Sequence, residues 1–474
     1  MDTGEGMMEG ARNGRRLGLR LVRQSPQLSL TWTPTGTTKC GHEHARENLE
    51  SYGVLRSARR RSVMEILHRR CAGLDVHKDT VMACVLIRES ASGRKRKELR
   101  EFGTMTQDLL QLADWLRDCG VTHLAMEATG VYWKPVWNVL EGEFKVLLVN
   151  AQHIKRVPGR KTDVKDCEWI AELLQHGLVQ ASFVPPVEVR ELRDLTRYRA
   201  TLVGERARVA NRMEKVLEDA NLKLASVVTD ILGISERAIL EAIVRGEEDP
   251  ERLAEMARCR LRAKLPALRE ALRGRVTEHH RFLLGRLLAH VRFVEAEITE
   301  LEGRIAEQMR PFEKEVEQWV SIPGINEVAA WSLIAELGPR LEAFSSEQHL
   351  SSWAGMCPGS NESAGKRRTG KTRKGNPWVR RMLCQIGWGA ARSQGTYLSA
   401  KYHRIAARRG KKRAIIAVAH NVLVIGFHLI RNQRRYNELG PDYFDQLHRH
   451  RLERYLVRRL EALGNQVVIE PLHA

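Results

Sequence analysis

The sequence lacks any run of about 20 uncharged apolar residues, the length that a membrane-spanning helix needs. The nearest stretch, residues 414–430, contains His420, Asn421 and His428, so we expect it to form a buried helix. The eight cysteines include no CxxC pair. We therefore expect no membrane segment, and reduced thiols in a cytoplasmic protein.

The chain has fewer acidic than basic residues. The chain has 58 Asp and Glu against 78 Lys and Arg, which gives a formal charge of +20 and a pI of about 9.9. Such an excess favours a polyanionic partner, and nucleic acid is the leading candidate. The length of 474 residues predicts two or three domains.

The stretch 160–170 carries two carboxylates, Asp163 and Asp166, three positions apart. In a helix they share one side. That side continues through three apolar residues, Ile170, Leu173 and Leu174. Carboxylates that point inward need to be neutralised, and a divalent cation is the usual solution. Alternatively, Thr162 caps the helix and Asp163 only favours its positive end.

Two strands upstream carry further acids. Residues 73–78 are predicted to form a strand with Asp75 among apolar neighbours, and residues 121–127 a strand that ends at Glu127. In α/β sheets, sites are built at the carboxyl ends of strands. Together with Asp163 and Asp166, these acids form a predicted cage of oxygen ligands for Mg²⁺.

Residues 64–185 have the pattern of one α/β domain. Three sheet-forming runs precede helix, strand, helix, strand and helix: 72–77, 80–88 and 98–104, then 109–116, 121–127, 133–140, 146–150 and 163–174. This is the order of an RNase H-like fold, in which the first strand, the fourth strand and the last helix meet. Acids bridging one or two Mg²⁺ ions there can activate a nucleophile and stabilise a leaving oxygen in phosphoryl transfer. The alternative is an α/β domain with ordinary capping and surface acids.

Residues 1–63 are rich in Arg, Gly, Ser and Thr without a sustained hydrophobic period, so we expect a disordered extension. Met64 runs directly into the first strand. We interpret Met64 as the working start and residues 1–63 as an overrun upstream of the true start codon.

Residues 186–319 are predicted to be helical, after a boundary at Pro185-Pro186. A 3-4 spacing of apolar residues over 284–305 predicts a coiled-coil seam, which can pair two protomers or fold back on an earlier helix at 192–216. Arginines of the earlier helix can track phosphates or form a solvated face: Arg193, Arg197, Arg199, Arg206, Arg208 and Arg212.

Residues 320–446 are predicted to form a mainly helical C-terminal domain, followed by a tail at 447–474. Residues 321–326 and the apolar helix after them resemble a helix-hairpin-helix, whose backbone N–H groups can bind a phosphate. Asn326 stands where the second glycine of such a hairpin is usual, so a plain helix connection is the alternative.

The stretch 355–376 combines Ser363 with a basic loop: eight basic and no acidic residues lie between Lys366 and Arg381. Small neighbours leave the Ser363 hydroxyl approachable, and the loop can stabilise the charge of a pentacoordinate phosphorus. A serine nucleophile needs a base or a metal, and the acid set is the candidate for that help. Tyr397 and Tyr402 are rival nucleophiles. The alternative is a flexible nucleic-acid-binding loop with an incidental serine.

A second basic run lies at 408–413 and is a further patch for contact with a phosphate backbone. The predicted nucleic-acid contacts of the two segments are Lys366, Arg367, Arg368, Lys371, Arg373, Lys374, Arg408, Arg409, Lys411, Lys412 and Arg413.

These residues resemble the insertion-sequence transposases of the DEDD type, the bridge-RNA-guided serine recombinases. The resemblance spans residues 64–444 and is strongest around Asp75 (71–78), around Glu127 (126–130), at 161–166 and at 361–376. It implies an N-terminal domain similar to the RuvC resolvase, whose four acids map onto Asp75, Glu127, Asp163 and Asp166. It also implies a C-terminal transposase domain whose serine nucleophile maps onto Ser363.

The resemblance implies partners as well. In the family, an RNA made from the element's flank pairs with target and donor DNA, and the serine forms a covalent phosphoserine link before strand exchange. Dimers assemble into tetramers in which one protomer's acids meet another's serine. We therefore expect a Mg²⁺-dependent, RNA-guided recombinase that moves its own insertion sequence, nucleoid-associated in a prokaryotic cytoplasm. The alternatives are a structure-selective DNA nuclease that uses a metal-bound water and an inactive nucleic-acid-binding regulator.

Overall fold

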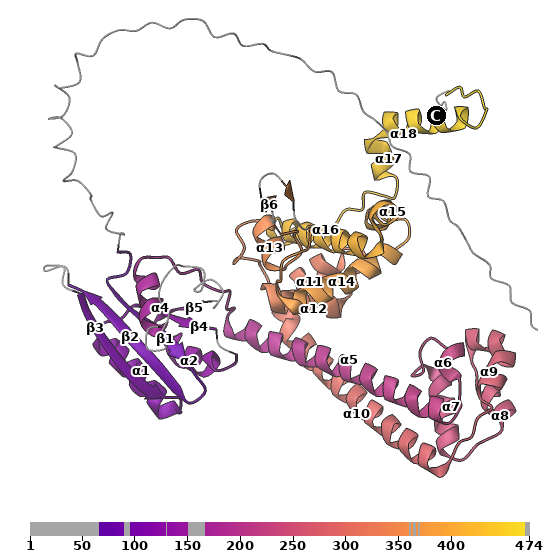
Figure 1. The fold of residues 1–474 in the computed structure, drawn as a ribbon, viewed down its shortest axis with the longest axis horizontal. Coiled ribbons are helices and arrows are strands. Elements are labelled where there is room, and N and C mark those ends of the chain that lie inside the picture. Colours follow the sequence, from indigo (N-terminus) through magenta and orange to yellow (C-terminus); the bar gives the residue numbers. More distant parts are fainter. Residues whose placement is uncertain are drawn as a thin grey trace, which may run out of the picture. The chain divides into compact units, whose positions relative to one another are not determined.

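The computed structural model describes residues 66–89, 95–128, 130–149, 166–359, 362–363, 366–367 and 370–469. These residues form a mixed α/β region followed by a mainly helical remainder (Figure 1). Three predictions made above, on the extension 1–63, on Asp163 and on Arg368, lie outside the described residues.

The α/β region is built on a five-stranded sheet with the strand order β3-β2-β1-β4-β5. β1 (Arg70–Val76) and β3 (Lys95–Gly103) both pair antiparallel with β2 (Thr80–Arg88). β4 (His123–Glu127) and β5 (Lys145–Val149) extend the sheet parallel to β1. The predicted succession of strands and helices is confirmed for the described residues.

The edge strand β3 begins three residues earlier than predicted. Its first residues, Lys95 to Lys97, are charged and give no apolar signal. In the folded chain, however, the Lys95 and Lys97 ammonium groups lie 2.8 and 2.9 Å from the Glu172 and Glu168 carboxylates of the helix behind the sheet. The start of β3 is paired with the end of β2, and these exposed ion pairs add a contact with that helix.

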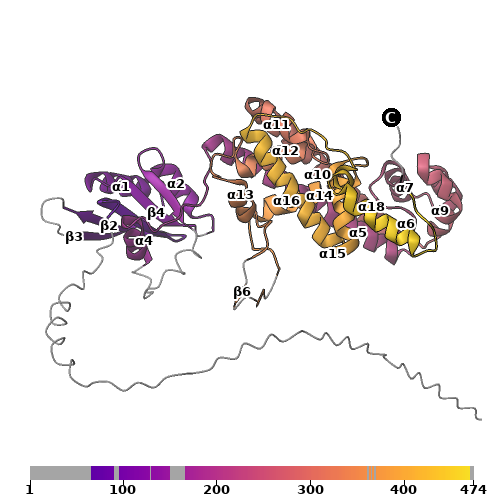
Figure 2. The same cartoon turned by 90° about the horizontal axis from the view of Figure 1, so that it is seen from above.

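Different helices cover the two faces of the sheet (Figures 1 and 2). On one face, α1 (Thr106–Asp118) and α2 (Trp133–Leu140) bury alternate residues of β1, among them Leu74. On the other face, α4 (Asp166–Gln175) packs on Cys71, Cys84 and Ala125. The predicted inward stripe of α4, which is Ile170, Leu173 and Leu174, is buried as expected.

Gly73 of β1 allows α4 to lie directly on the sheet. A Cβ atom at Gly73 would stand 2.2 Å from the Cys167 carbonyl oxygen and 2.5 Å from the Ala171 nitrogen. Both neighbours are backbone atoms, so neither can rotate out of the way. Only glycine fits between β1 and α4.

Gly73→Ala is therefore expected to lower the free energy of unfolding by about 1–3 kcal/mol or more, as overpacking of a close contact does. Denaturant unfolding measures the change. Gly142→Ala is the control, because a Cβ at Gly142 meets no atom within 4 Å, and its effect should stay within about 0.5 kcal/mol. Equal stability of the two variants would contradict the tight packing of α4 on β1.

The helical remainder begins with α5 (Val187–Asp219), and α10 (Glu278–Met309) runs back along it in the same chain (Figure 1). The predicted seam of α10 is buried at Leu284, Val291, Val294 and Ile305. Of the two open alternatives, the fold-back on the earlier helix is the one observed. The chain that connects the two helices forms a smaller helical group, which shares a core with the end of α5 and the start of α10. Its elements are α6 (Leu224–Val227), α7 (Ile234–Val244), α8 (Pro250–Glu255), the 3₁₀ helix Cys259–Lys264 and α9 (Leu265–Ala271).

Several arginines of α5 have acidic partners within the chain. Arg199 pairs with Glu302, and Arg206 and Arg237 both bind Glu295 of α10. The hydrogen bond from Arg237 is the main cause that holds the pKa of Glu295 below its usual value. The sequence analysis had considered phosphate contacts or a solvated face for these arginines, and ion pairing within the chain is a third role. Of the six arginines, Arg208 and Arg212 are the exposed ones.

A second helical core contains the C-terminal elements α11 (Glu313–Val320), α12 (Glu327–Leu337), α13 (Glu347–Trp353), α14 (Pro377–Arg392), α15 (Tyr397–Arg409) and α16 (Lys411–Arg431). A 3₁₀ helix, Arg310–Phe312, precedes them, and α17 (Tyr443–Leu447) and α18 (Arg449–Glu461) follow. Among the described residues, α16 alone is long and apolar enough to cross a membrane. Because α16 buries one full face in this core, from Ala414 to Ile430, the prediction of a buried helix is confirmed.

The turn between α11 and α12 packs on α14. Gly324 has a φ of +91°, and a Cβ on it would stand 2.3 Å from the Ala390 nitrogen. Asn326 caps α12, since its side-chain oxygen accepts from the Ala329 N–H at 3.0 Å. The conformation of the turn therefore serves helix packing and capping.

Candidate active site

Two of the predicted acids lie side by side on the face of the sheet that α4 covers. Side chains alternate along a strand, so Asp75 points to the same face as Cys71 and Gly73, and Glu127 to the same face as Ala125. β1 and β4 are adjacent and parallel, and their last paired residues are Leu74 and Met126. Asp75 and Glu127 are the next residues of these two strands.

The third acid, Asp166, is the first described residue of α4, the helix on this same face (Figure 2). Asp75, Glu127 and Asp166 are thus collected from two strands and a helix, although up to 91 positions (166 minus 75) separate them. The fourth acid, Asp163, precedes α4 and lies outside the described residues. Ser363 belongs to the helical remainder and not to this face of the sheet.

Asp75 has a neighbour that the sequence reasoning did not assign. Only 8% of Asp75 is exposed, and its Oδ2 lies 3.3 Å from His77 Nε2. The His77 N–H donates to the Thr80 carbonyl oxygen at 2.9 Å, which holds His77 in the β1–β2 turn. The sequence carried a signal for this contact: His77 comes two residues after Asp75, and side chains two residues apart on a strand point to the same face. A protonated His77 would compete with a cation for this carboxylate.

The donor chemistry of this face fits a hard cation better than a soft one. Asp75, Glu127 and Asp166 offer carboxylate oxygens, the ligands that Mg²⁺ prefers. Burial raises the pKa of Cys71 to about 12 and that of Cys167 to about 11. At neutral pH these two cysteines are therefore uncharged thiols. Within the described part of the chain, however, no three His, Cys, Asp or Glu side chains are grouped closely enough to hold a metal ion.

Ser363 lies in a hairpin between α13 and α14 rather than in an unpaired loop. Gly359 N–H donates to the Lys371 carbonyl oxygen at 2.9 Å, and Pro358 forms a bridge with Thr372. Further out, β6 (Glu362–Ser363) pairs antiparallel with β7 (Lys366–Arg367). Ser363 is the last residue of β6 and lies opposite Lys366.

The rival nucleophiles Tyr397 and Tyr402 are packing residues. The Tyr397 hydroxyl lies 3.3 Å from Asn421 Nδ2, and its ring stacks on Phe444 at a centroid distance of 5.1 Å. Tyr402 is buried in the second helical core. Both side chains therefore contribute to packing within the helical remainder.

The second basic run covers the junction of α15 and α16. Gly410, with a φ of +83°, ends one helix and begins the next. The five basic residues around it are exposed, and in the described chain none has an acidic partner: Arg408, Arg409, Lys411, Lys412 and Arg413. Three of them lie in the first turn of α16, where cations oppose the helix dipole. A phosphate bound there would relieve this repulsion.

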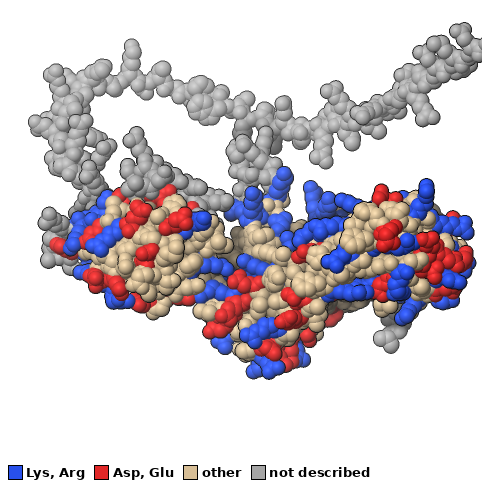
Figure 3. Space-filling view, turned by 90° about the horizontal axis from the view of Figure 1, so that it is seen from below, with Lys and Arg blue, Asp and Glu red and all other residues tan. Residues whose placement is uncertain are grey.

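In the first basic segment, Lys371, Arg373 and Lys374 are exposed, while Lys366 and Arg367 are described by their backbone only. Figure 3 shows Lys and Arg spread over one face of the described surface with Asp and Glu among them. Positive charge as such therefore does not mark a binding site on that face. Positive charge without an acidic partner is the better guide.

Replacing Lys411, Lys412 and Arg413 together by Gln is expected to weaken DNA binding. The slope of log K against log salt concentration should fall by about 0.9 for each phosphate that the protein no longer neutralises. The control is Gln at Arg252, Arg273 and Arg304, which removes the same charge from exposed residues that have acidic partners. Titrations at several salt concentrations measure both slopes, and equal slopes in the two variants would assign the effect to net charge alone.

Two family models match the chain. The DEDD_Tnp_IS110 model, a transposase, matches residues 72–221, and a model of the transposase IS116/IS110/IS902 family matches residues 318–403. A comparison with curated proteins gave no match. The acid-bearing α/β region and the serine hairpin thus both lie within segments typical of transposases, enzymes that cleave DNA and transfer its strands. The protein belongs to the IS110 family of DEDD transposases.

Proposed function

We propose that this transposase exchanges DNA strands through a phosphoserine intermediate at Ser363, with Asp75, Glu127, Asp163 and Asp166 as its acid set. The observation that carries the proposal is the placement of Asp75 and Glu127 on neighbouring parallel strands, on the face where α4 begins at Asp166. Carboxylates that share one face of a sheet repel one another unless a cation or another partner neutralises them.

The fold assigned to the acid-bearing domain, residues 64–185, is RNase H-like. Support comes from the strand order β3-β2-β1-β4-β5 with β1, β4 and β5 parallel and β2 reversed. The acid set would hold one or two Mg²⁺ ions, which when bound would favour ionisation of the attacking hydroxyl and stabilise charge on the phosphate. The helical region 186–319 and the transposase domain 320–446, with a helix-hairpin-helix at 321–326, complete the proposed organisation.

The proposed reaction begins when the Ser363 Oγ attacks a DNA phosphorus atom. An Oγ–P bond forms, and the phosphorus–oxygen bond to the neighbouring nucleotide breaks. A carboxylate of the acid set accepts the hydroxyl proton, and the leaving oxygen takes up a proton as the strand end is released. Attack by the hydroxyl of another strand end reverses these steps and joins the new strands. The basic residues of the hairpin stabilise the extra negative charge on phosphorus.

The proposed partners are target and donor DNA and an element-encoded bridge RNA that pairs with both. Dimers would assemble into a tetramer in which the acids of one protomer act with the serine of another. Ser363 and the acid set belong to different regions of the chain, the helical remainder and the α/β region. The exposed run at 408–413 and the residues Lys371, Arg373 and Lys374 would contact phosphates.

The test is to trap the intermediate. Protein incubated with RNA, DNA and Mg²⁺ is quenched in denaturant, and the covalent protein–DNA adduct is digested and sequenced by mass spectrometry. DNA attached to the peptide that contains Ser363 supports the proposal. Cleaved DNA without any adduct would instead favour a nuclease that uses water. Attachment at Tyr397 would identify Tyr397, and not Ser363, as the nucleophile.

A further inference from the structure

The hairpin that carries Ser363 is clamped at its base. Gly355 at its start and Gly375 at its end touch through their backbones, since a Cβ on Gly375 would stand 2.3 Å from the Gly355 nitrogen. Arg380 Nη1 donates to the carbonyl oxygens of both Gly355 and Arg373, at 3.1 and 3.2 Å. The two ends of the hairpin therefore leave the helical core as one unit.

The next residue after this clamp, Asn376, has two separate hydrogen-bonding roles. Its Oδ1 caps α14 by accepting from the Trp378 and Val379 N–H groups, at 2.9 and 3.2 Å. Its Nδ2 donates to Glu336 Oε2 of α12 at 2.7 Å. Asn376 thus ties the end of the hairpin to α12.

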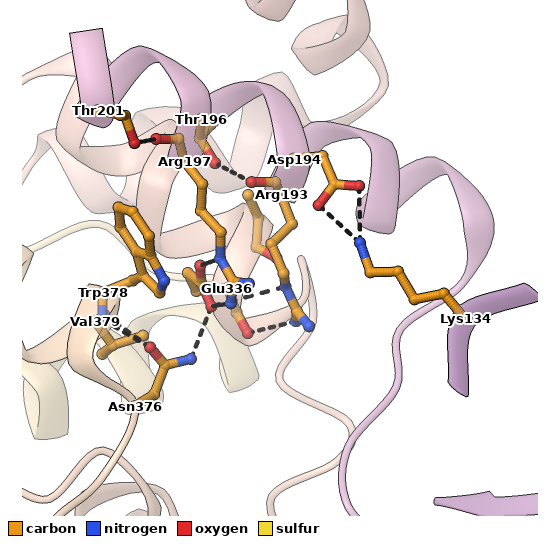
Figure 4. A network of polar contacts seen from close by, with 11 residues as sticks. Lys134, Arg193, Asp194, Thr196, Arg197, Thr201, Glu336, Asn376, Trp378 and Val379 are labelled. Atoms are coloured by element: carbon orange, nitrogen blue, oxygen red, sulfur yellow. Dashed lines mark hydrogen bonds and ion pairs between the residues drawn. The ribbon is translucent and has the colours of Figure 1, made fainter. Parts of the chain in front are cut away.

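Glu336 is a buried carboxylate, only 3% exposed, at the centre of this network (Figure 4). Arg197 of α5 binds it through two nitrogens, Nε at 2.6 Å and Nη2 at 2.9 Å. Arg193 donates to the backbone carbonyl oxygens of Ala335 and Glu336. Three elements distant in sequence, α5, α12 and the N-terminus of α14, therefore meet at one side chain.

We propose that Glu336 and Asn376 are positioning residues, which set the direction in which the hairpin projects and so the place of Ser363. The proposal rests on the proposed role of Ser363. That serine lies eight residues beyond Gly355, roughly 25 Å of extended chain. Over this length a tilt of about 5° moves the tip by about 2 Å, and misplacement by about 1 Å can cost roughly 10²-fold in rate.

Swapping the carboxylate of Glu336 and the amide of Asn376 tests the proposal. Asn376→Asp keeps the cap on α14 but places a second carboxylate against Glu336. Glu336→Gln removes the buried negative charge, and either orientation of the new amide sets its NH₂ group against a former donor, Arg197 or Asn376. The double variant, Glu336→Gln with Asn376→Asp, restores one donor and one acceptor between the two side chains and keeps one negative charge, while Arg197 keeps its Nε bond to an oxygen of residue 336. Ser346→Asp is the control, because Ser346 caps α13 in the same core and its cap has no buried carboxylate beside it.

The rate of adduct formation at saturating DNA is measured together with DNA affinity. Each single variant is expected to react roughly 10- to 100-fold more slowly at unchanged affinity, and the double variant should recover part of the rate. The control should react like the wild type. Wild-type rates in both single variants would overturn the proposal, and so would a double variant as slow as the single ones.

Hydrogen exchange of the amides at 355–375 gives a readout that does not depend on chemistry. Exchange should be faster in the single variants than in the wild type and should return to normal in the double variant. If wild-type protein forms no adduct at Ser363, the proposed function fails, while the exchange result still decides the positioning role. Should Asn376→Asp fail to fold, Asn376→Ser keeps a cap and removes only the bond to Glu336. Unchanged hydrogen exchange in the single variants would overturn the positioning role of Glu336 and Asn376.

Discussion

Ser363→Ala is expected to abolish the covalent protein–DNA adduct, with a loss of at least about 10³-fold, as when a catalytic nucleophile is removed. The reason is chemical: alanine has no oxygen with which to form the bond to phosphorus. Because the variant removes no charge, binding of RNA and DNA should persist. Denaturing gels measure the adduct, and band shifts at matched salt measure binding.

Tyr397→Phe is the matched control, since it also removes a single hydroxyl from the same region of the chain. Its hydroxyl interacts with Asn421 and Lys401 inside the protein. We expect adduct formation close to wild type and at most a modest loss of stability. A Ser363→Ala protein that still forms adduct, or a Tyr397→Phe protein that does not, would remove Ser363 from the nucleophile position.

Asp75→Asn is expected to reduce strand cleavage by about 10²–10³-fold or more, the range found when one group that stabilises a transition state is lost. Asparagine has the same shape but lacks the charge and basicity of the carboxylate. DNA binding should be unchanged or tighter, because one negative charge is removed. Cleavage and binding assays on the same preparations measure the two effects, and Asp163→Asn should behave in the same way.

Asp118→Asn removes an equal charge from an exposed position at the end of α1, and it should cleave like the wild type. Added Mg²⁺ gives a second comparison. If Asp75 takes part in holding the ion, a higher concentration should partly restore cleavage in Asp75→Asn. Loss of DNA binding in this variant would count against its catalytic assignment, because the protein would then have lost more than a reactive group.

Local patterns were sufficient to predict most of the described elements. Short apolar runs predicted the strands around Asp75 and Glu127, and helical spacing predicted the buried stripe at Ile170, Leu173 and Leu174, because both signals depend on neighbours in sequence. They failed where charge replaced apolar residues. β3 begins at Lys95, and its first residues form ion pairs with α4 that no local period reveals.

The arginines show that sequence alone cannot decide which basic residues find an acidic partner within the chain. Arg197 and Lys412 are both cations on helices, yet the first binds the buried Glu336 while the second is exposed without an acidic partner in the described chain. The choice of partner is a long-range contact, 139 residues along the chain for Arg197 and Glu336. The sequence likewise left two possible partners for the apolar seam of α10, a second protomer or an earlier helix of the same chain, and in the structure α5 packs against it.

By itself, the sequence determined which residue types are present and which face of each element they share: acids on strand ends, a serine among small residues, and a surplus of positive charge. Only the tertiary structure decided which of these groups meet. It brought Asp75, Glu127 and Asp166 to one face of a sheet, and it joined Asn376, at the end of the serine hairpin, to Glu336 of α12. The physical reason is that spacing constrains near neighbours, whereas packing and charge pairing between distant segments depend on the whole fold.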